Sequence, residues 1–174
     1  MSFDYAGYNR NGQLFYAANV STKNVVAVAT AMTGLILYNP AGSGKNCLIA
    51  DVGFSWVTAP AAVHNLGIGL AAPHVTIPSS LTAAGSPTKR ADGSGNAGGS
   101  ITVAYDAATL AVAPVAARWL GGAVYGSGVG ESPYAGFWEI QGALMLMPGA
   151  VACLIGLTTT LAGVGSITWA EVPV

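Results

Sequence analysis

The stretch that decides the fold runs from Ile140 to the C-terminus and reads IQGALMLM, PGAVACLIGL, TTTLAGVGSITWAEVPV. Pro148-Gly149 suits the two central positions of a type II turn, because proline presets the first φ and glycine accepts the positive second φ. In the final segment Ile167 and Trp169 fall on one face, with Ser166, Thr168 and Ala170 on the other. A period of two is typical of a half-buried strand. The stretch therefore predicts strand, tight turn, strand, short loop, strand.

A membrane-spanning helix is the alternative interpretation of this stretch. Ala143–Leu161 carries no charge and is about as long as a spanning helix requires. Pro148-Gly149 in its middle and the three threonines Thr158–Thr160 oppose that reading. No Lys or Arg flanks either end, so the usual interfacial anchors are missing. We expect strands here, and no membrane partner.

The composition points to one domain whose surface is largely covered by neighbours. The chain has 174 residues, enough to bury its own core. Only 7% of them are charged, against about 25% in an ordinary soluble domain. The net charge is −1 and Lys and Arg are not clustered, which excludes binding driven by attraction to nucleic acid or anionic membranes. The start of the chain lacks a basic segment followed by an apolar run, so no signal peptide is expected.

Residues 13–174 are expected to form one β-domain of eight to ten short strands. The predicted strands are Gln13–Ala18, Asn24–Ala31, Gly34–Tyr38, Lys45–Thr58, Leu66–Leu70, His74–Ile77, Gly99–Tyr105 and Arg118–Tyr125, besides those of the C-terminal stretch. Thr109–Ala117 reads as a short helix or strand that Pro114 interrupts. The turn-rich loop Asn39–Gly44 predicts an antiparallel hairpin, and 79–99 reads as a flexible exposed loop. These patterns favour an all-β fold, an antiparallel β-sandwich of jelly-roll type.

Residues 1–12 are interpreted as an N-terminal arm. They mix aromatic residues with turn formers and show no period. One hypothesis is a frayed terminus; the other is an extended arm that docks on a partner through its aromatic side chains. The candidate contact residues are Phe3, Tyr5, Tyr8 and Arg10.

Two stretches imitate nucleotide-binding motifs. Gly42-Ser43-Gly44-Lys45 resembles the end of a P-loop, but Asn39 and Asn46 occupy positions where the motif needs Gly and Ser or Thr. Gly93-x-Gly95-x-x-Gly98 matches the dinucleotide fingerprint but follows Lys-Arg-Ala-Asp rather than an apolar strand. We expect no cofactor.

Metal and catalytic sites are not expected either. His64 and His74 are the only histidines and have no acid or Cys close by in sequence. The acids Asp51, Asp106, Glu131, Glu139 and Glu171 are scattered, although a glycosidase pair could assemble from distant strands. Cys47 and Cys153 lie among apolar residues and read as buried thiols, with a disulfide as the alternative.

The segments GQLFYA (12–17), GLILYNPAGSGKN (34–46), MPG (147–149) and SITWAEVP (166–173) resemble a family of virion structural proteins of tailed bacteriophages. The order is that of the family: a Leu-Tyr-Asn-Pro strand end, a Gly-Ser loop, a Pro-Gly turn and a closing Trp-acid-Val-Pro strand. The resemblance covers residues 12–58 and 136–174, and its motifs are turns and strand ends rather than a catalytic signature.

The resemblance implies a β-sandwich that oligomerises, often as a trimer, on a phage particle. Capsid decoration (cement) proteins fit the size best. The expected function is therefore a non-enzymatic virion protein on the outer surface of the capsid, which bridges neighbouring copies of the major capsid protein. A spike or tail-fibre head that binds host surface glycan is the alternative, and a glycan depolymerase comes third.

Overall fold

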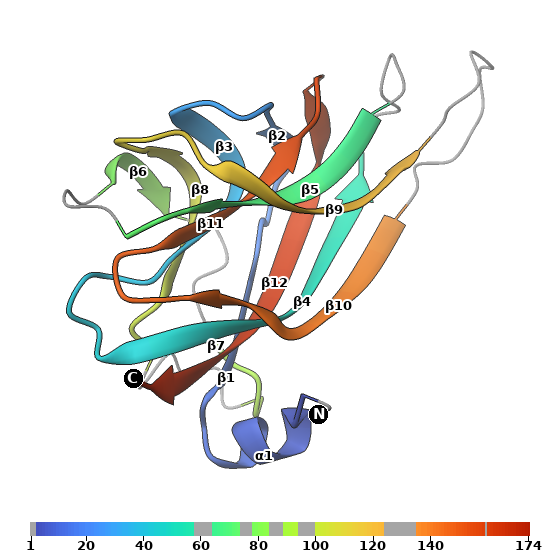
Figure 1. Cartoon of the computed structure of the whole chain (residues 1–174). Helices are drawn as coiled ribbons and strands as arrows, with labels where there is room; N and C mark the ends of the chain where they lie inside the picture. The colour runs from blue at the N-terminus through green and yellow to red at the C-terminus, as the bar shows by residue number, and fades with distance from the viewer. Residues whose placement is uncertain are drawn as a thin grey trace.

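The computed structural model describes residues 3–57, 64–73, 78–83, 89–93, 100–123, 135–158 and 160–174. These residues form two six-stranded antiparallel sheets and a short helix, α1 (Tyr5–Arg10) (Figure 1). The all-β expectation is confirmed. Within the described ranges, no helix has the length and apolar character that a membrane span requires.

The first sheet has the strand order β10-β4-β12-β1-β7, and β2 also pairs with β12. Its strands are β10 (Ala135–Leu146), β4 (Lys45–Trp56), β12 (Leu161–Pro173), β1 (Leu14–Ala18), β7 (Lys89–Arg90) and β2 (Lys23–Val25). The second sheet has the order β6-β8-β3-β11-β5-β9. Its strands are β6 (Ser79–Ala83), β8 (Val103–Thr109), β3 (Ala31–Tyr38), β11 (Val151–Gly156), β5 (His64–Ala71) and β9 (Val115–Ala123).

The main apolar core draws side chains from both sheets. Alternate residues of β4 and β12 enter it, among them Val52, Trp56 and Trp169, and they meet Leu66 and Leu154 of the second sheet. The predicted alternation of the final strand is confirmed at Ile167 and Trp169, which are buried. Figure 1 shows the two layers that this core joins.

A second apolar cluster lies on the opposite face of β11 and β3. It includes Met32, Ile36, Cys153 and Ile155, so β11 is buried on both faces along its whole length. The linker between β8 and β9 helps to cover this face: Leu110 is buried, and its N–H donates to the Thr30 carbonyl at 2.8 Å. A strand that is covered twice reads as a continuous apolar run, which explains the membrane-like composition of the stretch.

Strands that follow one another in the sequence mostly lie in different sheets. The predicted hairpin around Asn39–Gly44 is therefore wrong. Residues 39–44 join β3 of the second sheet to β4 of the first, so these two strands are not a hairpin. Pro148-Gly149 likewise joins β10 to β11 across the two layers. The turn itself is as predicted, since Gly149 has φ +90° and the Ala150 N–H donates to the Met147 carbonyl at 3.0 Å. Turn residues specify a reversal of the chain, not the strand with which it pairs.

Asn39 fastens these two connections together. Its side-chain Nδ2 donates to the carbonyls of Lys45 (2.8 Å) and Leu146 (2.9 Å). Its own N–H donates to the Ala150 carbonyl, and its carbonyl accepts from the Gly149 N–H at 2.7 Å. The Leu-Tyr-Asn-Pro motif thus has a structural role, because a buried asparagine replaces the missing ladder bonds at the corner.

Several predicted segments differ from the observed ones. The predicted loop 79–99 contains β6 and β7, while 84–88 and 94–99 lie outside the described residues. The strand expected at 24–31 is shorter, and 110–114 forms a linker. In the segment leading into β8, Thr102 and Ala104 are buried, whereas Ile101 and Val103 are partly exposed. The predicted strand 74–77 lies outside the described residues.

Candidate functional site

The N-terminal segment is helical where an extended arm was expected. Asp4 caps α1, because its Oδ1 accepts a hydrogen bond from the Gly7 N–H at 2.8 Å. Gly12 follows the helix with φ +66°, the conformation that commonly ends a helix. Asp4 before the helix and Gly12 after it are residues that typically flank a helix. The helix was not predicted because the segment has no apolar period of 3.6 residues.

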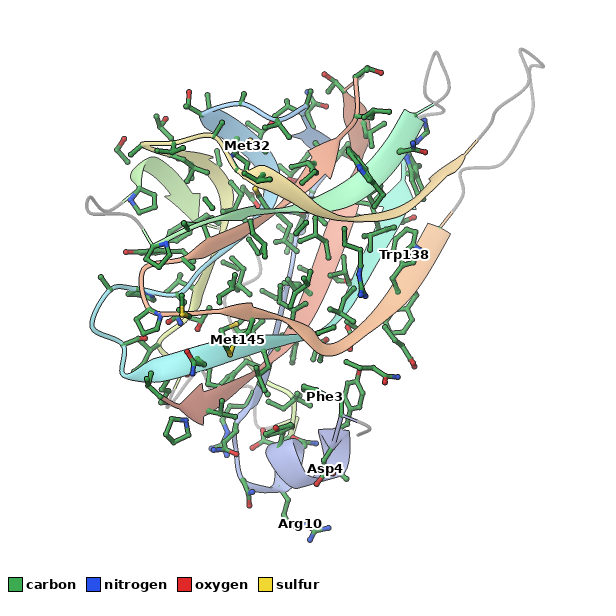
Figure 2. The ribbon with its side chains drawn as sticks, viewed as in Figure 1. Phe3, Asp4, Arg10, Met32, Trp138 and Met145 are labelled. Atoms are coloured by element: carbon green, nitrogen blue, oxygen red, sulfur yellow. The ribbon has the colours of Figure 1, made fainter. Side chains whose placement is uncertain are left out.

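The predicted contact residues divide into two groups. The Phe3 ring lies 4.7 Å from that of Tyr5 and 4.9 Å from that of Tyr8. Phe3 also packs against the backbone of Gly142 in β10, where a Cβ would approach its ring within 3.2 Å. Arg10 is exposed and points away from the sheets (Figure 2). The structure therefore gathers the three aromatic residues on the chain's own sheet and leaves Arg10 outside.

The helix is seated where the first sheet is irregular. The register of β4 with β12 shifts between Thr168 and Trp169, and that with β10 shifts between Glu139 and Leu144. Both shifts skip Ala50, and its carbonyl accepts a hydrogen bond from the Tyr5 hydroxyl at 3.2 Å. Bulges free backbone groups from the ladder, so Tyr5 satisfies a group that the sheet leaves open.

Two carboxylates are neighbours close to the place where α1 contacts the first sheet. Asp51 of β4 is paired in register with Glu139 of β10. Burial raises the pKa of Asp51, and the charge of Glu139 adds to the rise, while hydrogen bonds from Thr168 and Tyr5 oppose it. Burial and the same two charges raise the pKa of Tyr5 to about 12. Asp51 is buried, whereas Glu139 is exposed to solvent.

Glu171 is the most heavily bonded acid among the described residues. It is 1% exposed, and its carboxylate accepts hydrogen bonds of 2.9–3.4 Å from Ser100 Oγ, the N–H groups of Ile101 and Thr102, Lys45 Nζ and Trp169 Nε1. Burial would raise its pKa, but these bonds together lower the pKa of Glu171 below its ordinary value. The arrangement anchors residues 100–102 to β12.

Other residues that were considered as possible site residues make contacts that stabilise the fold. Lys45 of the P-loop-like stretch pairs with Glu171 at 3.1 Å, and a strand follows it. His64 is buried, with its ring 5.7 Å from that of Trp56. Cys47 and Cys153 are free, buried thiols, as expected, and burial raises the pKa of both. His74 and Gly95–Gly98 lie outside the described residues, and the part of the chain that is described holds no cluster of three metal-ligating side chains.

A cleft, here called the edge cleft, lies between β9 and β10, the terminal strands of the two sheets. Its volume is about 460 Å³, and its lining residues are Arg118, Trp119, Leu120, Phe137, Trp138, Glu139 and Ile140. Leu120 and Trp138 (labelled in Figure 2) pack against the core, while Trp119 and Phe137 remain 43% and 64% exposed. Sequence reasoning missed this cleft, because it depends on which strands end the sheets.

A second, more polar cleft of about 470 Å³ lies between β2, β3 and β8. At its base the buried Asp106 accepts a hydrogen bond from Asn19 Nδ2 (2.6 Å) and pairs with Lys23 Nζ (2.9 Å). Asn19 Oδ1 in turn accepts from the Gly165 N–H. These groups satisfy one another, so the cleft is a structural junction between the sheets.

One end of the molecule, here called the apolar end, presents exposed aliphatic side chains from four connections. They are Val20, Val28, Val57 and Leu157. Hydrogen bonds hold these connections together, for example from the Leu157 N–H to the Asn65 carbonyl and from the Gly156 N–H to the Val26 carbonyl. The described residues of these connections, 19–22, 26–30, 57, 157–158 and 160, include no charged side chain.

Comparison with protein-family models, with curated proteins and with solved structures finds no match for this chain.

Proposed function

We propose that the protein is a structural subunit of a tailed-phage virion that decorates and stabilises the capsid. In this proposal it has no enzymatic activity, and it lies on the outer surface of the shell, where it bridges neighbouring copies of the major capsid protein. The apolar end is the observation that carries the proposal. Loss of charge and exposure of aliphatic groups are features of interface cores.

The proposal includes a β-sandwich of the jelly-roll type. Four strand pairings support this plan: β1 with β12, β3 with β11, β4 with β10, and β5 with β9. They nest the first half of the chain against the second half in reverse order, as in a long hairpin that is rolled up into two sheets. Folds of this type occur in viral capsid and lectin domains, and such an analogy alone does not assign a function.

Self-association as a homotrimer is also part of the proposal. With 7% charged residues, a free subunit has little electrostatic repulsion to keep copies apart. Light scattering at micromolar concentration should give about three times the 17.3 kDa chain mass. A measured mass equal to that of a single chain would contradict the trimer. That result would not bear on the proposed capsid-binding surface.

The capsid-binding surface is tested by charge insertion. Replacing Val20 and Val57 with Asp should weaken cosedimentation with undecorated capsids at least tenfold, since unpaired charges at an interface core are costly. Val174→Asp is the matched control: Val174 is 79% exposed, and it lies at the opposite end of β12, where its N–H bonds to the Gly44 carbonyl. Equal binding by the double variant, with unchanged circular dichroism, would refute this surface.

A further inference from the structure

We propose that the outer face of the first sheet, the face turned away from the second sheet, holds a carbohydrate-binding site. One sugar ring would stack on Phe137, while Ser55, Ser166 and Glu139 hydrogen-bond its hydroxyl groups. This inference does not depend on the virion role. It rests on a hollow in this face, here called the face hollow, and on the side chains around it.

The strand register places the side chains of this site on one face. Phe137 of β10 lies opposite Gly53 of β4, and Gly53 lies opposite Ser166 of β12. These three strands are neighbours in the first sheet (Figure 1). In the adjacent row, Val52 and Ile167 belong to the core. Because successive residues of a strand point to opposite faces, Phe137, Gly53 and Ser166 lie together on the outer face.

The Phe137 ring and the Ser166 hydroxyl converge above Gly53. A Cβ added to Gly53 would lie 2.6 Å from Ser166 Oγ and 3.9 Å from Phe137 Cδ2. Both groups are therefore within 4 Å of one point above the glycine backbone. Glycine allows such a close approach. Phe137 is also 64% exposed, so a sugar ring stacked on it would have the Ser166 hydroxyl within reach.

The face hollow provides room for one sugar ring. Its volume is about 260 Å³, and the residues that line it include Ala18, Gly53, Ser55, Ala135, Val164 and Ser166. Ser55 lies in register between Ala135 and Val164, so its hydroxyl group belongs to the same face. The volume is below the ~300–1,000 Å³ of sites for drug-sized ligands. We therefore expect one ring of an oligosaccharide in the hollow and the other rings in solvent.

The polar groups around the hollow match the chemistry of a sugar. Serine hydroxyls both donate and accept hydrogen bonds, and the carboxylate of Glu139 accepts them, whereas sugar hydroxyls do both. Glu139 is exposed and lies two residues from Phe137, about 7 Å along the strand. Its Oε2 accepts a hydrogen bond from Gln141 Nε2 at 2.8 Å, which orients the carboxylate. The C–H groups on a sugar-ring face carry slight positive charge and suit the negative face of an aromatic ring.

Two other classes of ligand fit this face less well. A nucleic acid stacks on exposed rings but needs a cationic groove, and the described residues that line the face hollow include no Lys or Arg. An organic cation suits an aromatic ring beside a carboxylate, but it makes no use of the hydroxyl groups of Ser55 and Ser166. A carbohydrate uses the ring, both hydroxyls and the carboxylate.

The test starts with a glycan array of neutral and acidic oligosaccharides, followed by titration calorimetry with the best ligand. Phe137→Leu should lower the affinity about tenfold, because it keeps an apolar side chain but removes the stacking ring. Ser166→Leu should abolish detectable binding, because the larger side chain fills the hollow. Trp119→Leu is the matched control: Trp119 is 43% exposed and lies over Gly67 on the outer face of the second sheet. Its affinity should equal that of the wild type.

Circular dichroism checks that each variant is folded. Three results would overturn the inference: no glycan bound by the wild-type protein, wild-type affinity in both hollow variants, or an equal loss in Trp119→Leu. Tighter binding of tetramethylammonium than of any glycan would assign the site to an organic cation instead. None of these results bears on whether the apolar end binds a capsid, so the two proposals fail separately.

Discussion

Replacing Glu171 with Gln tests how strongly one buried carboxylate holds the two sheets together. Five donors converge on its two oxygens, from the backbone, from two neighbouring side chains and from Lys45. A glutamine has nearly the same shape but offers one acceptor oxygen and no charge. Its amide nitrogen would face other donors, chiefly Lys45 Nζ.

The expected loss of folding free energy in Glu171→Gln follows from the kind of hydrogen bond that is lost. Hydrogen bonds to a charged group contribute about 1.5–3 kcal/mol and neutral ones about 0.5–1.5 kcal/mol. The two backbone donors, at the part-buried Ile101 and the buried Thr102, should each lose roughly 1 kcal/mol. Lys45 is 32% exposed, so solvent screens its pair with Glu171 and reduces the loss to ~0–1 kcal/mol. Glu171→Gln should therefore destabilise the protein by about 2–3 kcal/mol.

Urea unfolding followed by tryptophan fluorescence measures this loss. With a slope of about 2 kcal/mol per molar urea, the midpoint should fall by roughly 1–1.5 M. The matched control is Glu139→Gln, an exposed carboxylate on β10, for which a change within about 0.5 kcal/mol is expected. Equal midpoints for the two variants would refute the reasoning.

The same carboxylate predicts a pH dependence. Because the folded-state pKa of Glu171 is lowered from 4.5, its contribution is fully present above that value and is lost as pH falls through the folded pKa. The stability difference between wild type and Glu171→Gln should narrow in that acidic range. A difference that is constant from pH 7 to pH 2 would contradict the assignment.

Three further variants test single features. Asp51→Asn should melt at the same or a higher temperature than the wild type at pH 7. The raised pKa of Asp51 means that its ionised form destabilises the folded protein. The difference in melting temperature should therefore shrink as the pH falls through that pKa. A lower melting temperature at pH 7 would count against it. Gly149→Ala should cost about 1–2 kcal/mol, since φ is +90° there, and an unchanged thermal midpoint would mean that the turn adapts. Tyr5→Phe should cost about 1 kcal/mol through the lost bond to the Ala50 carbonyl, and equal urea midpoints would show that this bond is not needed.

Local features of the fold were predictable from the sequence. The strands of the C-terminal stretch and the positive φ of Gly149 follow from alternation and from turn chemistry, both of which act over a few residues. The pairing of strands was not predictable in this way. Residues 39–44 and Pro148-Gly149 each cross between sheets because the cores of both layers must be filled together, and that constraint involves residues more than a hundred positions apart.

The candidate sites were less predictable. Phe3, Tyr5 and Tyr8 were identified as contact residues, but their contacts include the chain's own sheet, because bulges around Ala50 create a seat that no sequence pattern marks. The sequence shows Glu171 only as one of several scattered acids, since most of its five donors come from distant segments. The residues of the edge cleft are aromatic and charged in the sequence, but only the strand order places β9 and β10, with Leu120 and Trp138, at the same edge of the two sheets.

An image of the virion in which this subunit is located tests the central claim most directly. Decoration predicts hundreds of copies on the outer surface of the capsid, each with Val20, Val28, Val57 and Leu157 turned toward the shell. Density for a few copies only, at the tail or its fibres, would contradict capsid decoration and favour the glycan-binding alternative. Absence of the subunit from the particle would refute the virion role altogether.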